Sequence, residues 1–298
     1  MKVLVLVKSL HPYWNEVELG VKAAAKKYNL EATFSAFPKE DSAEQIAIIE
    51  DFISKGGEGL AFAVSNPEAL VGLIKKIKDK SIPCIALDTD APQTGRDLYI
   101  GTNNYLAGKM AGDTLASLLS SKGEVAIGTG SLFAPNSKER IQGFKDSLSR
   151  FPKIKIVTTL CDDERADEAF SLAQSALLNY ENLSGFYGVF NSNGPAAAKA
   201  VKSANKVGKI KIVCFDTSPE TIKFIKEGVI NATIGQRPYT IGYRSVEFLY
   251  KMATSGIDEV LKSVPPSRRI DTGVDVVTLE SLNSYRDFLK KLGIPISF

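Results

Sequence analysis

Histidine, tryptophan and cysteine are scarce in this sequence, and their scarcity limits the kinds of disulfide and metal site that the chain can form. The 298 residues contain one histidine, one tryptophan and three cysteines. Cys84, Cys161 and Cys214 are odd in number, far apart and embedded in apolar runs. A disulfide framework or a zinc site is expected to show paired, closer spacings. We therefore predict buried thiols rather than a disulfide or a metal site.

Blocks of one charge and long apolar runs are also missing. The net charge of +3 is spread over the whole chain without a dense Lys/Arg block, so we expect no nucleic-acid partner. No run approaches the roughly 18–20 apolar residues of a membrane span. No secretory signal is present, because the first apolar run begins at residue 3. We expect either a cytoplasmic chain or one whose leader has been removed.

Strand-like and helix-like segments alternate along the chain with short connections. The predicted strands cover 3–7, 32–37, 59–64, 82–87, 99–101, 124–129, 153–160, 185–190 and 209–215. The predicted helices cover 15–28, 42–55, 67–80, a segment from about 104, 138–149, 165–180, 195–205 and 219–227. This alternation is typical of right-handed βαβ units in parallel sheets with helices on both faces. Because the units are too many for one sheet, we predict an α/β protein with two doubly wound domains.

The segment His11-Pro12-Tyr13-Trp14 directly follows the first predicted strand. That position lies at the carboxyl edge of a sheet, where open α/β folds bind ligands. Aromatic faces suit the C–H-rich faces of a sugar, and an imidazole can hydrogen-bond its hydroxyls. The alternative is that Tyr13 and Trp14 begin the core of the next helix.

Other polar side chains follow other strands or begin helices. Arg140 lies in the first turn of the helix predicted at 138–149. The rest follow predicted strands: Asp88, Asp90, Asp163, Asn191, Asn193, Asp216 and Gln236. A carboxylate accepts hydroxyl donors, arginine donates a planar fork, and an amide can do both. Carboxylates with one arginine and aromatics suit a neutral polyol, whereas a phosphate site needs more cations or a glycine loop.

Catalysis is the weaker interpretation. Nothing in the sequence sets the separation of two carboxylates, as glycosidase chemistry requires. A serine or cysteine triad would depend on His11, and no nucleophile elbow is present. The glycines of Ile127-Gly-Thr-Gly-Ser131 lack both the P-loop lysine and the dinucleotide-binding spacing. We predict no catalytic residue, no cofactor and no metal.

An ordered set of segments resembles the ribose-type periplasmic sugar-binding proteins of ABC transporters, over nearly the whole chain. The similarity is greatest to the thermophilic glucose/xylose-binding branch. The segments are Lys8-Ser-Leu-His-Pro-Tyr-Trp14, Leu87-Asp-Thr-Asp90, Tyr99-Ile-Gly-Thr-Asn-Asn-Tyr105, Asn136 through Arg140-Ile-Gln-Gly-Phe144, Asn193-Gly-Pro-Ala196, Cys214-Phe-Asp216, Gly235-Gln-Arg-Pro-Tyr239 and Asp271-Thr-Gly-Val-Asp-Val-Val277.

The resemblance implies the type I fold of that family, with two lobes joined by three crossing segments. Residues 1–102 and 237–271 would form the N-terminal lobe, and residues 103–236 and 272–298 the C-terminal lobe. The crossings would lie near Thr102-Asn103, Gln236-Arg237 and Asp271-Thr272.

The resemblance also implies a sugar site. In many relatives an Asn stands where this chain has His11, and Asp163 falls where ribose binders stack an aromatic ring. Ala63 replaces an Asn of the ribose binders, which favours glucose or xylose over ribose. The implied site residues are His11, Tyr13, Trp14, Asp88, Asp90, Arg140, Asp163, Asn191 or Asn193, Asp216 and Gln236.

By resemblance, the function is that of an extracytoplasmic, periplasmic solute-binding protein of an ABC sugar importer. We expect a monomer whose lobes close on a monosaccharide and whose closed form is recognised by a membrane permease. We also expect Arg140 to face solvent without sugar, so that its replacement by methionine lowers affinity but not stability.

Two other functions remain open. The effector core of a LacI-type transcriptional regulator shares this fold, but such regulators carry a helix-turn-helix head, whereas here the first strand begins at residue 3. A sugar-metabolising enzyme of this architecture is the third possibility. The start of the native gene distinguishes them: a leader or lipid-anchored cysteine, a DNA-binding head, or neither.

Overall fold

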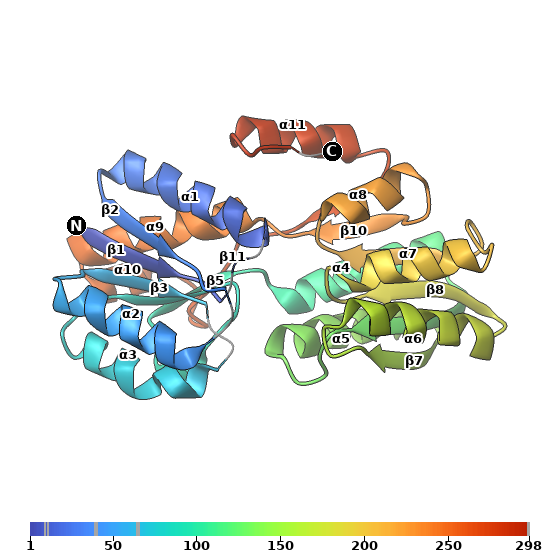
Figure 1. Cartoon of the computed structure of the whole chain (residues 1–298), viewed down its shortest axis with the longest axis horizontal. Coiled ribbons are helices and arrows are strands. Elements are labelled where there is room, and N and C mark those ends of the chain that lie inside the picture. The colour runs from blue at the N-terminus through green and yellow to red at the C-terminus, as the bar shows by residue number, and fades with distance from the viewer. Residues whose placement is uncertain (9, 11, 39–40, 64–65, 297–298) are drawn as a thin grey trace. The chain divides into compact units, whose positions relative to one another are not determined.

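The computed structural model describes the chain except for residues 9, 11, 39–40, 64–65 and 297–298. The chain forms two compact units (Figure 1). Unit 1 contains Met1–Thr102 and Arg237–Gly273, and unit 2 contains Asn103–Gln236 and Val274–Phe298. The third crossing between the units therefore lies at 273/274 rather than at 271/272. The reason is that the N–H of Thr272 donates to the Gly101 carbonyl oxygen at 3.0 Å, which extends the pairing of the last strand of unit 1.

Unit 1 is built on a six-stranded sheet in the order β11-β5-β4-β3-β1-β2. All of its neighbouring strands pair in parallel. The strands are β1 (Lys2–Leu6), β2 (Glu31–Ser35), β3 (Gly59–Phe62), β4 (Cys84–Leu87), β5 (Leu98–Gly101) and β11 (Arg269–Asp271). The helices are α1 (Pro12–Tyr28), α2 (Ser42–Ser54), α3 (Val71–Lys78), α9 (Pro238–Ser255) and α10 (Ile257–Lys262), with 3-10 turns η1 (Pro67–Leu70) and η2 (Pro92–Thr94).

The residues of β1 alternate between two cores, one on each face of this sheet. Val3 and Val5 belong to the core that α1 and α9 complete, and Leu4 and Leu6 belong to the core of α2 and α3. A strand buried on both faces is continuously apolar, as parallel sheets require.

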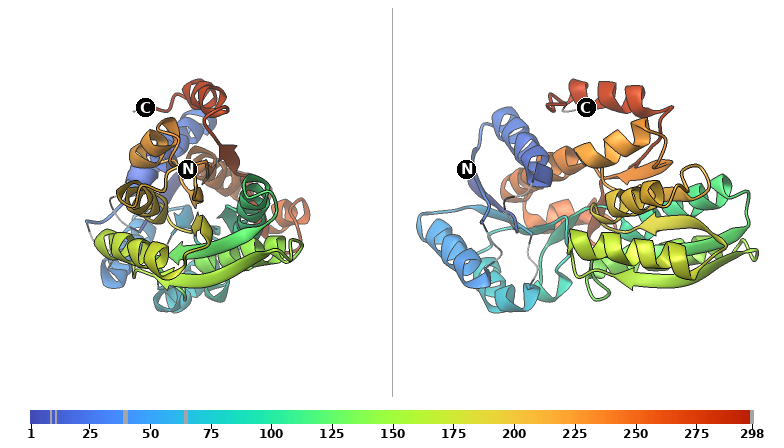
Figure 2. Two further views of the ribbon diagram at one scale, coloured as in Figure 1. Left: turned by 90° about the vertical axis from the view of Figure 1, so that its right-hand side faces the viewer. Right: turned by 45° about the vertical axis from the view of Figure 1, so that its right-hand side comes forward.

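Unit 2 repeats this plan with the order β12-β10-β9-β8-β6-β7. Its strands are β6 (Gly123–Thr129), β7 (Ile154–Cys161), β8 (Leu183–Gly188), β9 (Lys211–Phe215), β10 (Ala232–Gly235) and β12 (Asp275–Val277). Its helices are α4 (Asn104–Leu118), α5 (Pro135–Leu148), α6 (Ala166–Asn179), α7 (Asn193–Ser203), α8 (Pro219–Lys226) and α11 (Leu282–Lys291). Only β12 pairs antiparallel among the described strands of this sheet. The predicted α/β fold with two doubly wound, mainly parallel sheets is confirmed, and further views show helices over both faces of the sheets (Figure 2).

One helix pair in each unit crosses at closely packed glycines. In unit 1, a Cβ on Gly20 of α1 would overlap the Tyr239 carbonyl of α9, and a Cβ on Gly242 would overlap the Val17 carbonyl. In unit 2, a Cβ on Gly143 of α5 would overlap the Tyr105 carbonyl of α4, and a Cβ on Gly108 would overlap the Arg140 carbonyl. These glycines are therefore required by close backbone approach rather than by a turn.

Two predicted helix starts were wrong by three residues, and one predicted helix is divided in two. Helix α1 begins at Pro12 rather than at 15, and α5 begins at Pro135 rather than at 138. In both cases proline occupies the first helical position, where its missing N–H costs nothing. The helix predicted at 67–80 is divided into η1 and α3.

Cys84 and Cys214 are buried as predicted, whereas Cys161 is partly exposed. Within the described ranges, no helix is long and apolar enough to cross a membrane.

Candidate ligand-binding site

The carboxyl end of β4 in unit 1 brings Asp88 and Tyr13 together. Asp88 has a φ of 62°, a left-handed conformation that Asp tolerates better than most residues. Its N–H donates to the Ile100 carbonyl at 3.0 Å, and its own carbonyl accepts from the Tyr99 hydroxyl at 2.9 Å. The Asp88 carboxylate accepts from the Tyr13 hydroxyl at 2.7 Å and from the Thr89 hydroxyl at 3.1 Å. Asp88 stays partly exposed, so its oxygens can also accept from a ligand.

Trp14 lies in the core of unit 1, as the alternative interpretation of its segment has it. It is 6% exposed and packs in one cluster with Val17 and Val21. Because α1 begins at Pro12, Trp14 lies in the first helical turn on the same face as those two valines. Its ring meets that of Tyr13 edge-on, with centroids 5.0 Å apart. Trp14 can therefore support Tyr13, but it does not present a free stacking face.

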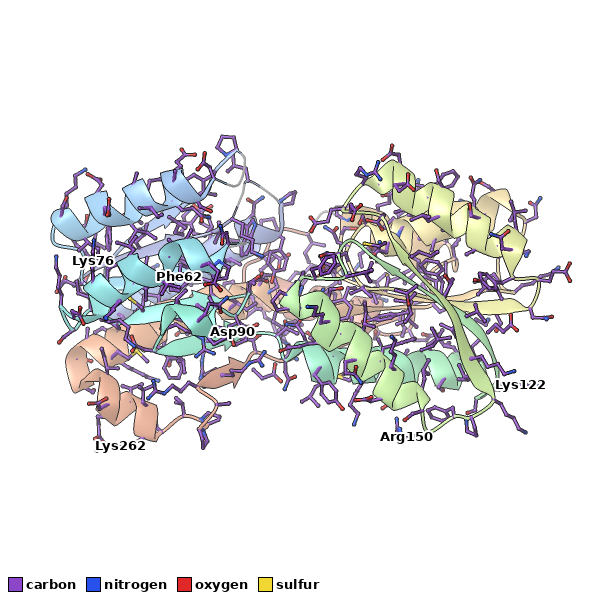
Figure 3. The ribbon with its side chains drawn as sticks, turned by 90° about the horizontal axis from the view of Figure 1, so that it is seen from below. Phe62, Lys76, Asp90, Lys122, Arg150 and Lys262 are labelled. Atoms are coloured by element: carbon purple, nitrogen blue, oxygen red, sulfur yellow. The ribbon has the colours of Figure 1, made fainter. Side chains whose placement is uncertain are left out.

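Asp90 is engaged in an ion pair instead of being open to a ligand. Asp90 is labelled in Figure 3. Both of its carboxylate oxygens accept from the guanidinium of Arg96, Oδ1 from Nε and Oδ2 from Nη2 at 2.7 Å. Arg269 adds a second cation at 3.5 Å, and the Ala91 N–H donates at 2.8 Å. The ion pair gives Asp90 a structural role, and its expected contact with a ligand stays a prediction. The expected site residue His11 lies outside the described residues.

Unit 2 repeats the Asp88 arrangement at the end of β9. Asp216 has a φ of 68°, and its N–H donates to the Ile234 carbonyl at 2.9 Å. Its carbonyl accepts from the Thr233 hydroxyl at 2.7 Å, and its carboxylate accepts from Nε2 of Gln236 at 2.8 Å. The structure therefore brings together Asp216 and Gln236, which lie on adjacent strand ends.

Arg140 is buried, contrary to the expectation that it faces solvent. It is 4% exposed and lies in the second turn of α5 rather than in the first. Its Nε donates to Oδ1 of Asn104 and its Nη1 donates to the Val189 carbonyl, both at 2.9 Å. The guanidinium also lies 3.9 Å from the ring centroid of Phe215, a close cation–π contact. Nη2 and the second N–H of Nη1 have no protein acceptor among the described residues.

The loop after β7 places two adjacent acids differently. Asp163 is exposed, with a φ of 51°, and receives only a weak contact from the Cys161 thiol at 3.5 Å. Asp162, which the sequence did not single out, is 2% exposed and accepts from Nδ2 of Asn193 at 2.5 Å. Burial raises the pKa of Asp162 to about 6. No signal in the sequence distinguishes the buried acid of this pair from the exposed one.

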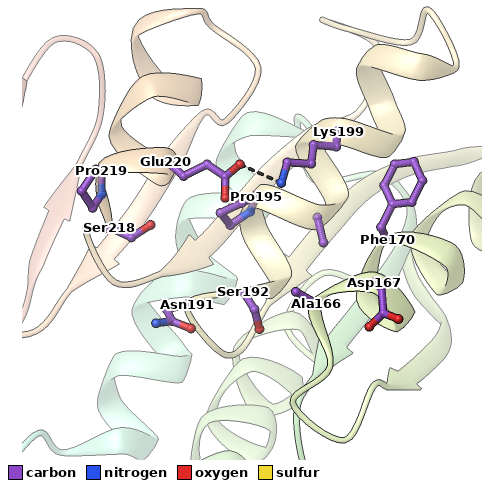
Figure 4. Close-up of a pocket in the computed structure, with 11 residues that line it drawn as sticks. Ala166, Asp167, Phe170, Asn191, Ser192, Pro195, Lys199, Ser218, Pro219 and Glu220 are labelled. Atoms are coloured by element: carbon purple, nitrogen blue, oxygen red, sulfur yellow. Dashed lines mark ion pairs between the residues drawn. The ribbon is translucent and has the colours of Figure 1, made fainter. Parts of the chain in front are cut away.

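The two candidate asparagines after β8 also separate. Asn193 is 2% exposed, and its Oδ1 accepts from the Phe190 N–H at 2.8 Å. Asn191 is partly exposed and lines an open hollow beside the first turns of α6, α7 and α8 (Figure 4). Lys199 of α7 and Glu220 of α8 form a 2.7 Å ion pair across this hollow. Of the two asparagines, Asn191 is therefore the one that is partly exposed.

Taken unit by unit, the strand ends present the groups that polyol hydroxyls need. Unit 1 supplies a carboxylate with a phenol beside it, and unit 2 supplies a carboxylate with an amide beside it. Unit 2 adds a guanidinium with donors to spare. Hydroxyl groups can donate to the carboxylates and accept from the arginine.

Comparisons with known proteins identify the family to which the chain belongs. A model of the periplasmic binding protein domain matches residues 3–257. The D-allose-binding periplasmic protein of Escherichia coli K12 is 26% identical over 278 residues, which are 90% of this chain and 89% of that protein.

Two solved structures are similar over nearly their whole length. An ABC transporter solute-binding protein from Burkholderia graminis, in complex with D-arabinose, has a TM-score of 0.84 at 34% identity, covering 96% of this chain and 97% of that one. GanP, a glucose-galactose binding protein from Geobacillus stearothermophilus, has a TM-score of 0.81 at 31% identity, covering 94% and 98%.

Proposed function

The chain belongs to the periplasmic binding protein domain family, and from this premise we propose that it is the sugar-binding component of an ABC importer. The similar proteins described above are binding proteins for sugars, and the prediction that this chain is not an enzyme is confirmed. Family membership supports an extracytoplasmic location and a membrane permease as partner.

The observation that carries the proposal is the environment of Arg140. Buried charges are normally paired or fully hydrogen-bonded. The guanidinium of Arg140 contacts an amide oxygen, a backbone carbonyl and an aromatic ring, and no ion pair to it occurs among the described residues. Sugar hydroxyls would supply neutral acceptors for its remaining donors.

For the ligand we propose a monosaccharide, with glucose or xylose favoured over ribose. Ala63, which directly follows β3 and is fully buried, offers no hydrogen-bonding side chain where the ribose binders carry an Asn. GanP, named as a glucose-galactose binder, supports a hexose. The proposed site residues are Tyr13, Asp88, Arg140, Asn191, Asp216 and Gln236, with His11 and Asp163 as further candidates.

For the mechanism we propose ligand-driven closure of a monomer. A sugar that gains contacts from both units shifts the population toward a closed form. The permease would then recognise that form rather than the sugar itself.

A thermal melting screen tests the function. The ligands are D-glucose, D-xylose, D-ribose, D-arabinose, D-allose and D-galactose, with calorimetry on any that shifts the transition. A micromolar Kd corresponds to about 8 kcal/mol of binding free energy. Millimolar sugar then stabilises the folded protein by about 4 kcal/mol if the unfolded chain does not bind it. A screen without a shift for any pentose or hexose would contradict the proposal, and so would recovery of chemically altered sugar.

A further inference from the structure

Asp162 is a buried carboxylate at the carboxyl end of β7, and both its backbone and its side chain are hydrogen-bonded. Its N–H donates to the Thr129 carbonyl of β6 at 3.0 Å. One carboxylate oxygen accepts from the Glu164 N–H at 3.0 Å, and the other accepts from Nδ2 of Asn193 at 2.5 Å. Asp162 is 2% exposed, so its carboxylate is buried.

Asn193 connects Asp162 to the loop of residues 189–192, which joins β8 to α7. Its Oδ1 accepts from the Phe190 N–H at 2.8 Å. Its side chain lies over two glycines that are register partners in β6 and β8, Gly128 and Gly188. A Cβ on Gly188 would lie 3.0 Å from the Asn193 Cβ, so a larger residue there would displace the asparagine.

The same loop is one of the supports of Arg140. Nη1 of Arg140 donates to the carbonyl of Val189, the residue before Phe190. Asn191, a proposed sugar contact, lies between Phe190 and Asn193. The Asp162–Asn193 pair therefore anchors one end of a short loop that carries one proposed ligand group and orients another.

We propose that Asp162 is a positioning residue for the sugar site: through Asn193 it holds the 189–192 loop, and ionised Asp162 favours sugar binding. This inference rests on the proposed function. It predicts that sugar is bound more weakly in acid, because the neutral acid is a poorer acceptor for the Asn193 amide than the charged carboxylate is.

The titration of Asp162 falls in a range that can be tested. Burial is the main cause that raises its pKa to about 6, and Glu164 and Asp163 of its own turn add repulsion. Arg165 is exposed and faces Glu168 at 3.9 Å. Thr129 of β6 and Asn193 of α7, which hydrogen-bond to Asp162 from neighbouring elements, carry no titratable side chain. Lys199, further along α7, is paired with Glu220 at 2.7 Å.

Ionisation of Asp162 should lower the stability of the folded protein, whereas it should raise the affinity for sugar. The folded protein holds this proton more tightly than the unfolded chain does, so Asp162 costs stability as pH rises through about 6. Asp162→Asn removes that cost. Its melting temperature should gain on the wild type between about pH 4 and about pH 6 and then stay ahead.

The decisive experiment measures the Kd of the screened sugar that gives the largest thermal shift, from about pH 5 to about pH 8. Wild-type affinity should fall up to about tenfold toward pH 5 for each pKa unit by which binding shifts Asp162. Asp162→Asn should bind with an affinity that does not vary with pH. The matched control is Glu164→Gln, which removes a charge from the same turn without touching Asn193. It should keep the pH dependence of the wild type, with the midpoint moved toward lower pH because one source of repulsion on Asp162 is gone. Parallel profiles for the wild type and Asp162→Asn would overturn the proposal.

A sugar-free readout separates this inference from the proposed function. Hydrogen exchange at the Phe190 amide should be faster in Asp162→Asn than in the wild type and in Glu164→Gln. Unchanged protection of that amide overturns the anchoring role, whether or not any sugar binds. If Asp162→Asn does not fold, Asn193→Ala removes the same link from the other side and should show the same loss of protection. If no sugar binds to the wild type, the proposed function fails while the exchange result still decides the anchoring role.

Discussion

Each unit contains a buried arginine, Arg96 in unit 1 and Arg140 in unit 2, and the two are satisfied in different ways. Arg96 makes a bidentate contact with Asp90 and donates to the Arg268 carbonyl at 3.1 Å. Arg140 has no carboxylate partner among the described residues and rests on Asn104, Val189 and Phe215. A cation already neutralised within the protein serves the fold, whereas one with donors left over is available to a neutral ligand.

The first turns of α1 in unit 1 and α5 in unit 2 also carry side chains with different roles. Helix α1 begins Pro12-Tyr13-Trp14, and α5 begins Pro135-Asn136-Ser137. The third position is a core aromatic in unit 1, while in unit 2 the Ser137 hydroxyl lies 2.7 Å from that of Thr129. The shared plan thus covers the backbone, the positive φ of Asp88 and Asp216 and the helix-crossing glycines, and the side chains around it are specialised.

The largest expected effect is that of Trp14→Ala on unit 1. Removing a buried aromatic leaves a cavity and should cost about 3–5 kcal/mol of unfolding free energy in a denaturant titration. The matched control in unit 2 is Phe133→Ala, an aromatic that is 82% exposed, with an expected change within about 0.5 kcal/mol. Lost sugar affinity without lost stability would instead make Trp14 a ligand contact.

Methionine substitutions of the two arginines should sharpen their contrast. Arg96→Met leaves the Asp90 carboxylate with only the more distant Arg269 as a cation and should cost about 3 kcal/mol of unfolding free energy, with sugar affinity nearly unchanged. Arg140→Met should cost about 2–4 kcal/mol of binding free energy, because sugar acceptors lose a charged donor. It should also lower stability, since Arg140 is only 4% exposed. Equal effects of the two variants on affinity would erase the distinction drawn between them.

Alanine at the crossing glycines tests whether the two helix pairs are equivalent. Gly20→Ala in unit 1 and Gly143→Ala in unit 2 each force a Cβ into a backbone carbonyl and should cost about 1–3 kcal/mol or more. Gly72→Ala in α3 is the control, because nothing lies within 4 Å of its added Cβ. It should gain up to about 1 kcal/mol of stability from helix propensity. Thermal melts of the three variants measure these changes, and a tolerated Gly20 or Gly143 variant would mean that the helices separate at little cost.

The smallest expected effect is that of Asp88→Asn and Asp216→Asn. Asparagine tolerates the positive φ at both positions, so stability should stay within about 0.5 kcal/mol. Each variant loses a charged acceptor for sugar hydroxyls and should weaken binding by about 1–2 kcal/mol in calorimetry. A variant without any effect on affinity would remove that carboxylate from the site.

Most of the fold could be predicted from the sequence, because the spacing of apolar residues and the residues that begin and end helices and strands are local properties of the chain. Apolar runs such as 3–7 mark strands buried on both faces, and the alternation with amphipathic segments indicates parallel sheets. The predicted starts of α1 and α5 were three residues late, because Pro12 and Pro135 each occupy the first helical position.

The sequence by itself determined which strand ends carry polar side chains, because order along the chain places Asp88, Asp216 and Gln236 at the carboxyl edges of their sheets. What each group does at that edge depends on the three-dimensional packing around it. Asp90 is neutralised by an arginine six residues away, Trp14 turns into the core, and Asp162 rather than Asp163 is buried against Asn193. Such pairings depend on how the folded backbone places side chains, which the order of residues does not reveal. Burial, in turn, changes the energy of a charge by more than the identity of its residue shows.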